Sequence, residues 1–203
     1  MKLLKRTTDI YGHAAWTVVR SGTANGSRTK NFRVVATDED QELYRAVVAY
    51  RGLGSVRSTV AQVQVWRWIP LADFPKYYSA GSVLTQYTSV SINGTMYPGW
   101  TTYGDTPSWE TRHTPGRNCK AFRGELGVQD GSDDGSSATI ELLTDETSSA
   151  YVSGPLTPGM VEHVEIPLDL PYRFTILARS TSPDGIHVYP GIGAPEFLCS
   201  YAS

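Results

Sequence analysis

The sequence has little cysteine, no excess of charge of one sign and no long apolar run. Two of its 203 residues are cysteine, and 18 Lys and Arg stand against 20 Asp and Glu, which gives a net charge of -2. Proteins that bind nucleic acid mainly through phosphates carry a clear excess of cations, so this class of function is excluded. No apolar stretch approaches the roughly 20 residues of a membrane-spanning helix, which predicts a chain without membrane insertion.

The N-terminus lacks the features of a secretion signal. Residues 1–6 carry positive charges, but polar residues from Thr7 onward follow without an apolar core segment or a cleavage site. Two cysteines that each end an apolar segment, Cys119 and Cys199, are nevertheless typical of a stapled extracellular domain. We therefore expect a protein that reaches a virion or another extracellular surface without a signal peptide.

Signatures of the common enzyme classes are also missing. The four histidines lie far apart without an HExxH or paired-ligand spacing, and no G-x-S-x-G elbow is present. Adjacent carboxylates such as Asp145 and Glu146 would point to opposite faces of a strand, whereas a glycosidase needs two that face one substrate. The glycine-rich segment 21–27 lacks the lysine of a P-loop. We expect a non-catalytic protein without a required cofactor.

Glycine, proline and tyrosine are abundant, and short β-branched runs recur between turn residues. This pattern predicts an all-β protein with a sandwich or barrel architecture. Residues 42–50 fit either a helix capped by Thr37 and Asp38 or the return strand of a hairpin that turns at 38–41, and we favour the hairpin. The other expected strands are residues 14–20, 32–36, 60–69, 89–97 with a tight Asn93-Gly94 turn, 122–128, 138–143, 161–166, 172–178 and 197–201.

A change of unit is expected near residue 70. Pro70 and Pro75 bracket a short segment, which is typical of a boundary. We therefore divide the chain into a β-rich N-terminal extension or docking region, residues 1–69, and a β-sandwich, residues 70–203.

Several short motifs of the second part follow one another in a recognisable order: residues 92–99, 116–119, 122–130, 154–156 and 198–199. Their order resembles that of the NPCBM/NEW2 domain, a carbohydrate-binding module related to carbohydrate-binding family 51, over about residues 66–203. The resemblance implies a galactose-binding-like jelly-roll sandwich in which the glycine turns and the segment 122–128 are framework.

The resemblance also bears on the cysteines and on sugar specificity. A similar cysteine pair is common in the family, so Cys119 and Cys199 are expected to bridge strands, with two buried thiols as the alternative. A disulfide would close a loop of about 80 residues and contribute roughly 4 kcal/mol on the chain-entropy model. Family members often carry a Gly-Thr-His-Ala-like stretch after the glycine that matches Gly99, where this chain has Thr102, Tyr103 and Gly104 instead.

The segment 100–113 holds the candidate sugar site. A sugar site needs an aromatic face for the apolar side of a pyranose and a few polar groups for its hydroxyls. This segment supplies both between Gly and Pro residues, which predicts a binding loop. The alternative is that its tryptophans belong to the core. The candidates are Trp100, Tyr103, Asp105, Trp109, Glu110, Arg112 and His113.

A second candidate site is a calcium loop over residues 130–141. Asp130, Asp134 and Glu141 occupy the first, fifth and twelfth places of an EF-hand-like pattern, with Gly135 in the sixth. The flanking segments are expected strands rather than helices, so a solvated hairpin turn is the alternative.

Three functional hypotheses follow. The first is a non-catalytic carbohydrate-binding or attachment module whose partner is a cell-surface glycan. The second is a structural decoration, capsid or tail protein of a tailed-phage virion, in which residues 1–69 dock onto other virion subunits and the protein forms a homo-oligomer. A third, a fragment of a bacterial glycosidase, requires a catalytic domain after Ser203.

Overall fold

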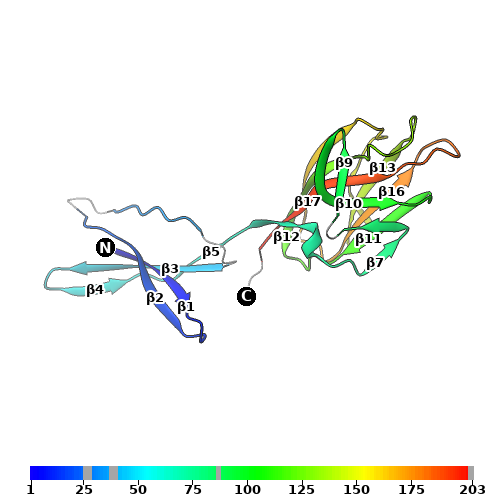
Figure 1. Cartoon of the computed structure of the whole chain (residues 1–203). Coiled ribbons are helices and arrows are strands. Elements are labelled where there is room, and N and C mark those ends of the chain that lie inside the picture. Colours follow the sequence, from blue (N-terminus) through cyan, green and yellow to red (C-terminus); the bar gives the residue numbers. More distant parts are fainter. Residues whose placement is uncertain (25–28, 37–40, 86–87, 201–203) are drawn as a thin grey trace. The chain divides into compact units, whose positions relative to one another are not determined.

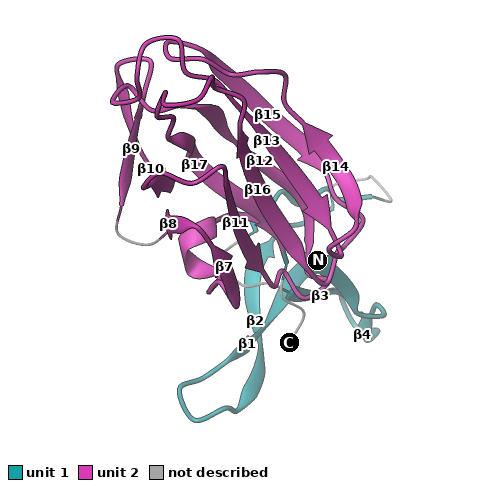
Figure 2. Ribbon diagram, turned by 90° about the vertical axis from the view of Figure 1, so that its right-hand side faces the viewer, with its two compact units in different colours: residues 1–66, 200–203 teal, residues 67–199 magenta. Residues whose placement is uncertain are grey.

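The structure is a computed structural model that describes residues 1–24, 29–36, 41–85 and 88–200. It divides into two compact units, which Figure 2 colours separately: unit 1 is Met1–Trp66 together with Ser200–Ser203, and unit 2 is Arg67–Cys199. Both units consist of antiparallel strands, as the composition predicted. Among the described residues, no helix has the length and apolar character needed to cross a membrane.

Unit 1 is one five-stranded sheet in the order β2-β1-β3-β4, with β5 beside β4 on the same edge of β3 (Figure 1). None of the residues of β2 is buried, and every residue of β4 and β5 is exposed. The strands are β1 (Lys2–Thr8), β2 (Ala14–Ser21), β3 (Gln41–Tyr50), β4 (Gly54–Arg57) and β5 (Ala61–Gln64).

The strand over residues 42–50 exists, but its predicted partner is wrong. Residues 32–36 form no strand, and β3 pairs instead with β1, with Lys2 opposite Val47. Positions 38–40 of the predicted turn lie outside the described residues. Strand β1 was not predicted, because charged residues are unusual in a strand that faces inward. The structure buries Lys5 of this strand against Glu42, with 3.1 Å between Lys5 Nζ and Glu42 Oε1. An ion pair of this kind lets a lysine occupy a strand position that faces inward.

Unit 2 is a sandwich of a seven-stranded and a five-stranded sheet. In the larger sheet, the order is β15-β12-β17-β10-β8, with β6 on β17 and β9 on β10; in the smaller it is β14-β13-β16-β11-β7. The strands are β6 (Arg67–Pro70), β7 (Tyr78–Ala80), β8 (Ser82–Leu84), β9 (Ser89–Ile92), β10 (Thr95–Tyr103), β11 (Ser108–His113), β12 (Cys119–Val128), β13 (Ala138–Thr144), β14 (Ser148–Val152), β15 (Val161–Pro167), β16 (Phe174–Ser180) and β17 (Pro190–Cys199), and a short 3-10 helix η1 (Leu71–Asp73) follows β6.

The single strand expected over residues 60–69 is two strands in different units. β5 ends at Gln64, and β6 begins at Arg67 and pairs with the end of β17, placing Pro70 opposite Glu196. The division between the units therefore falls before Arg67, and the expected boundary after residue 69 lies inside β6.

Aromatic rings fill the space between the two sheets. Phe197 packs on Phe74, Phe122 and Phe174 with ring centroids 4.9 to 5.2 Å apart, and all four rings are buried. Aromatic pairs at these separations add stability beyond the area that they bury. Cys119 and Cys199 form a disulfide between β12 and β17 beside this cluster, at facing positions of the ladder.

The β9–β10 hairpin turns at the expected dipeptide. Asn93 and Gly94 both have positive φ values, 50° and 73°, as a two-residue turn of this kind requires. The hairpin approaches the large sheet so closely that a Cβ on Gly127 would lie 2.3 Å from the Ile92 side chain. The framework glycines thus make room for a hairpin packed on the sheet.

Candidate functional site

The segment 100–113, expected to be a binding loop, is mostly strand. It contains the end of β10, a four-residue turn over 104–107 and all of β11. Trp100 and His113 have no exposed surface, and Trp109 is 1% exposed. The prediction that these three rings contact a sugar is therefore wrong, because none can present a face to a ligand.

Both tryptophans, Trp100 and Trp109, are part of the core of the sandwich. Trp100 donates a hydrogen bond from Nε1 to Thr111 Oγ1 at 2.8 Å. Trp109 donates from Nε1 to the backbone oxygen of Tyr103 at 3.2 Å. A buried indole needs such a partner, and these bonds also fix the end of β10 against β11.

His113 is a core residue as well. Its Nδ1 lies 2.8 Å from the Phe74 carbonyl oxygen and its Nε2 lies 3.3 Å from Thr111 Oγ1. Burial lowers the pKa of His113 to about 4, against a smaller opposing effect of the Phe74 hydrogen bond. The ring is therefore neutral at pH 7.

Tyr103 and Asp105 lie at one end of the sandwich, where three loops meet. The loops 104–107, 129–137 and 181–189 gather there because β10, β12 and β16 all end on this side. Tyr103 is 51% exposed and the Asp105 side chain is 83% exposed, so both face solvent. These are the two predicted residues that can meet a ligand at this end.

Hydrogen bonds join two of the three loops, and a close histidine–aspartate approach adds the third. The His187 amide donates to Asp133 Oδ2 at 2.8 Å, and Asp133 N donates back to the His187 carbonyl at 3.0 Å. His187 Nδ1 lies 3.4 Å from Asp105 Oδ1, which joins the third loop to this pair. We call Tyr103, Asp105, Asp133 and His187 the loop-end site.

Sequence reasoning missed Asp133 and His187. His187 lies 74 residues after His113 in the sequence, and only the fold brings it to Asp105. One signal was available: the turn residues 182–185 come shortly after the expected strand 172–178, which predicts a loop at a sandwich end.

The loop-end site is acidic. Its three loops contain five aspartates, no lysine and no arginine. Carboxylates accept hydrogen bonds from hydroxyl groups, whereas an anionic ligand would be repelled by them. The site therefore suits a neutral polyhydroxylated ligand.

The structure does not assemble the predicted calcium loop. Asp130 accepts hydrogen bonds from Ser91 Oγ and, at 2.9 Å, from the Gly94 amide, which lower its pKa and brace the β9–β10 turn. Glu141 lies in β13 and pairs with Arg179 at 3.1 Å. Within the described ranges, no three His, Cys, Asp or Glu side chains gather around a metal position, so the assignment of Asp130, Asp134 and Glu141 to one ion is corrected.

Glu110 and Arg112 belong to a different surface from the loop-end site. They lie on the outer face of β11, with 2.5 Å between Arg112 Nε and Glu110 Oε1. Arg112 also approaches Glu146 of the β13–β14 turn at 3.7 Å. The structure thus separates the candidates into a buried group, a loop-end group and this pair.

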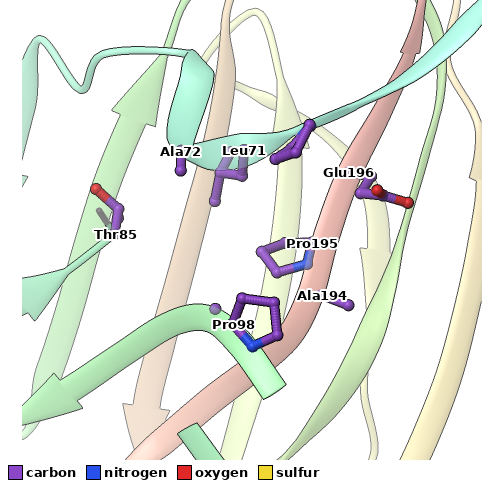
Figure 3. A pocket seen from close by; sticks show the side chains of 9 residues that line it. Leu71, Ala72, Thr85, Pro98, Ala194, Pro195 and Glu196 are labelled. Carbon is purple, nitrogen blue, oxygen red and sulfur yellow. The ribbon is translucent and has the colours of Figure 1, made fainter. Parts of the chain in front are cut away.

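An apolar pocket beside η1 is too small for a sugar. Figure 3 shows Pro98, Pro195 and Leu71 around it, and its volume is about 90 Å³. Ligand pockets are typically several hundred Å³. This pocket is therefore not the candidate sugar site.

Comparison with known proteins connects the fold to carbohydrate-binding modules. No family model and no curated protein matches the sequence. A family 51 carbohydrate-binding module from a Clostridium perfringens family 95 glycoside hydrolase, solved in complex with methyl-galactose, matches with a TM-score of 0.52 and 15% identity, over 64% of this chain and 99% of that one.

Two longer structures also match. The tandem family 51 modules of a Streptococcus pneumoniae family 98 glycoside hydrolase give a TM-score of 0.51 at 14% identity, over 72% of this chain and 54% of that one. The second family 51 module of Clostridium perfringens ZmpB, solved in complex with GlcNAc together with INT domains, gives 0.51 at 10% identity, over 78% and 37%. The chain therefore spans about half or less of these two structures.

These matches confirm the expected resemblance at the level of the fold. The β-sandwich of unit 2 is the fold of the family 51 modules, as the order of motifs in the sequence predicted. At such low identities, the matches show the fold alone, and the ligand has to be argued from the site itself.

Proposed function

We propose that this chain is a non-catalytic carbohydrate-binding module that binds a neutral sugar of a cell-surface glycan at the loop-end site. The observation that carries the proposal is the half-exposed Tyr103 at the end of β10, two residues before Asp105, which itself lies 3.4 Å from His187 of a neighbouring loop. Structures of similar fold were solved with methyl-galactose and with GlcNAc, both neutral sugars, which agrees with the acidic character of this end.

Tyr103 provides the platform in this proposal. Its backbone oxygen accepts the Trp109 indole hydrogen bond, and β8 pairs with it through Ser82, so the ring stands on a fixed strand end. A pyranose stacks its apolar face on such a ring while acceptors such as Asp105 bind its hydroxyls. Little ordering is then needed on binding, which favours affinity.

The test is titration calorimetry of the full chain with a panel of neutral methyl glycosides that includes methyl-galactose and GlcNAc. We expect Tyr103→Ala to weaken binding at least tenfold and Asp105→Asn to weaken it several-fold. The matched control is Tyr11→Ala, which removes an even more exposed tyrosine, 78% exposed, from unit 1. Equal affinities of the wild type and Tyr103→Ala would contradict the assignment.

A second candidate role is structural, and unit 1 supports it. Its hairpin turns and edge strands expose large apolar side chains, among them Ile10, Leu53 and Val56, which are 91%, 84% and 66% exposed. Residues 1–66 contain ten Lys and Arg against five Asp and Glu. An exposed apolar sheet with a cationic excess fits docking onto an acidic protein surface, such as a neighbouring subunit of a particle.

In this second role, the chain is a homo-oligomeric decoration or tail protein of a virion, and its sandwich is displayed at an extracellular surface. Light scattering on the full chain tests it, with Leu53→Ser and Val56→Ser expected to reduce self-association or attachment. Capsid and tail genes beside its own would support a virion. A monomer without attachment partners would leave the free carbohydrate-binding module as the better account.

A further inference from the structure

An open hollow lies at the end of unit 2 opposite the loop-end site. The loops 114–118, 145–147 and 168–173 meet there, because β12, β14 and β16 all begin on this side. The hollow is open and has a volume of roughly 510 Å³, within the range of ligand sites. It is lined by Arg117, Asp145, Glu146, Tyr172 and Arg173, and we call it the arginine–tyrosine hollow.

The backbone around this hollow is held in unusual conformations. Of the six described residues other than glycine with positive φ, four lie in its loops: Arg117 at 62°, Asp145 at 47°, Glu146 at 70° and Leu170 at 45°. Such conformations cost free energy and persist where the surroundings impose them, often at binding sites. Here Asp145 Oδ1 accepts hydrogen bonds from the amides of Tyr172 and Arg173, both at 2.9 Å, and so ties two loops together.

The Arg173 guanidinium of the hollow lies close to two tyrosine rings, Tyr172 in the lining and Tyr77 beside it. The Arg173 guanidinium carbon lies 4.2 Å from the ring centroid of Tyr77 and 5.6 Å from that of Tyr172. Tyr77 is 43% exposed and Tyr172 is 47% exposed, so each ring keeps accessible surface. Stacking on arginine fixes the orientation of a tyrosine ring, which prepares it as a platform for a ligand.

The carboxylates of the hollow are already engaged, whereas one cation is not. Glu146 accepts a hydrogen bond from Tyr77 Oη at 3.0 Å and lies 3.5 Å from Arg173 Nε and 3.7 Å from Arg112 Nη1. Asp145 accepts hydrogen bonds from the backbone amides of Tyr172 and Arg173. Arg117 is exposed, and among the described residues no carboxylate lies within ion-pairing distance of it. A planar guanidinium of this kind binds a carboxylate through two parallel hydrogen bonds.

We propose that the arginine–tyrosine hollow is a second saccharide site that binds a sugar bearing a carboxylate, such as a uronic or sialic acid residue. Arg117 binds the carboxylate, and Tyr172 offers its ring face to the sugar. The two sites favour ligands of different charge: this hollow offers a cation to a carboxylate, whereas the five aspartates of the loop-end loops, without Lys or Arg, disfavour an anion. The inference does not depend on sugar binding at the loop end.

The test is a binding measurement on the full chain with acidic sugars and their neutral counterparts. The probes are methyl β-D-glucuronide and sialyllactose, compared with methyl β-D-glucoside and lactose. We expect at least one acidic probe to bind tighter than its neutral counterpart by tenfold or more. We expect this preference to shrink in 0.5 M salt, because the ion pair lies at an exposed site.

Two variants locate the site. Arg117→Asn removes the cation with a residue that tolerates positive φ, and Tyr172→Ala removes the exposed ring; each should weaken the acidic probe at least tenfold. Arg179→Gln is the matched control, since it removes an exposed arginine that pairs with Glu141 outside the hollow. Thermal melting of each variant shows whether the fold is intact.

The inference is overturned if acidic and neutral probes bind equally, if neither acidic probe binds, or if Arg179→Gln weakens binding as much as Arg117→Asn does. The two proposals fail separately. Tyr103→Ala should weaken the binding of neutral sugars at least tenfold and leave the preference for an acidic probe over its neutral counterpart in place, whereas Arg117→Asn should remove that preference and leave the neutral sugars unaffected.

Discussion

Lowering the pH from 6.5 to 4 should destabilise unit 2 through one residue, His113. Its ring is fully buried, and because burial disfavours the charged form, the pKa falls from 6.5 to about 4, although the Phe74 hydrogen bond acts in the opposite direction. In the unfolded chain, the same histidine takes up a proton near pH 6.5. Between these two pH values, the unfolded state binds more protons than the folded state, so the free energy of unfolding falls as the pH falls.

The size of the effect follows from the two pKa values. A difference of 2.5 pKa units at about 1.4 kcal/mol per unit sets an upper limit near 3 kcal/mol, reached at about pH 4. At pH 5.5, the expected loss is about 1.4 kcal/mol. The contribution is fully present above pH 6.5.

The assay is urea unfolding followed by tryptophan fluorescence at several pH values, because Trp100 and Trp109 are buried in the same unit. The comparison is His113→Gln, which cannot titrate. Subtracting the two curves removes the other titrating groups and isolates His113. A difference in unfolding free energy that stays constant between pH 6.5 and 4 would refute the view that His113 is a neutral core residue.

Three further predictions concern stability. Replacing both Cys119 and Cys199 with alanine should cost roughly 4 kcal/mol of unfolding free energy, since the disulfide closes a loop of 80 residues; an unchanged urea midpoint would contradict this. Trp109→Ala should cost 3 to 5 kcal/mol by leaving a cavity and an unpaired Tyr103 carbonyl, and a well-folded variant that merely loses sugar binding would show that the ring is not in the core. Glu42→Gln should destabilise unit 1 by about 3 kcal/mol, because Lys5 loses its buried partner; thermal melting measures this, and an unchanged melting curve would argue against the ion pair.

The local signals that fix turns and strand faces were readable in the sequence of unit 2. Asn93 and Gly94 allow positive φ, so the hairpin between the expected flanking segments could be predicted from two residues. Residues 122–128 were likewise expected to form a strand, and they lie in β12 with Phe122 buried. Features of this kind depend on neighbours in the chain, and the structure reproduces them.

The predictions that failed concerned segments whose structure depends on residues distant in the sequence. The Gly and Pro residues around segment 100–113 suggested a long loop, but only residues 104–107 lie between β10 and β11, and the inward positions of β11 hold Trp109 and His113. The alternation of Trp109, Thr111 and His113 with Glu110 and Arg112 already carried this information, and it was outweighed by the turn residues. β1 was missed because its lysine is neutralised by Glu42, 37 residues away.

The central claim is that a neutral sugar binds at Tyr103 and its neighbouring loops. The most direct measurement is an NMR titration of the ¹⁵N-labelled full chain with neutral methyl glycosides, followed through the backbone amides. The account predicts that at least one glycoside shifts amides in the loops 104–107, 129–137 and 181–189 and that Tyr103→Ala removes these shifts. No shift with any member of the panel, or shifts confined to the rest of the chain, would contradict it.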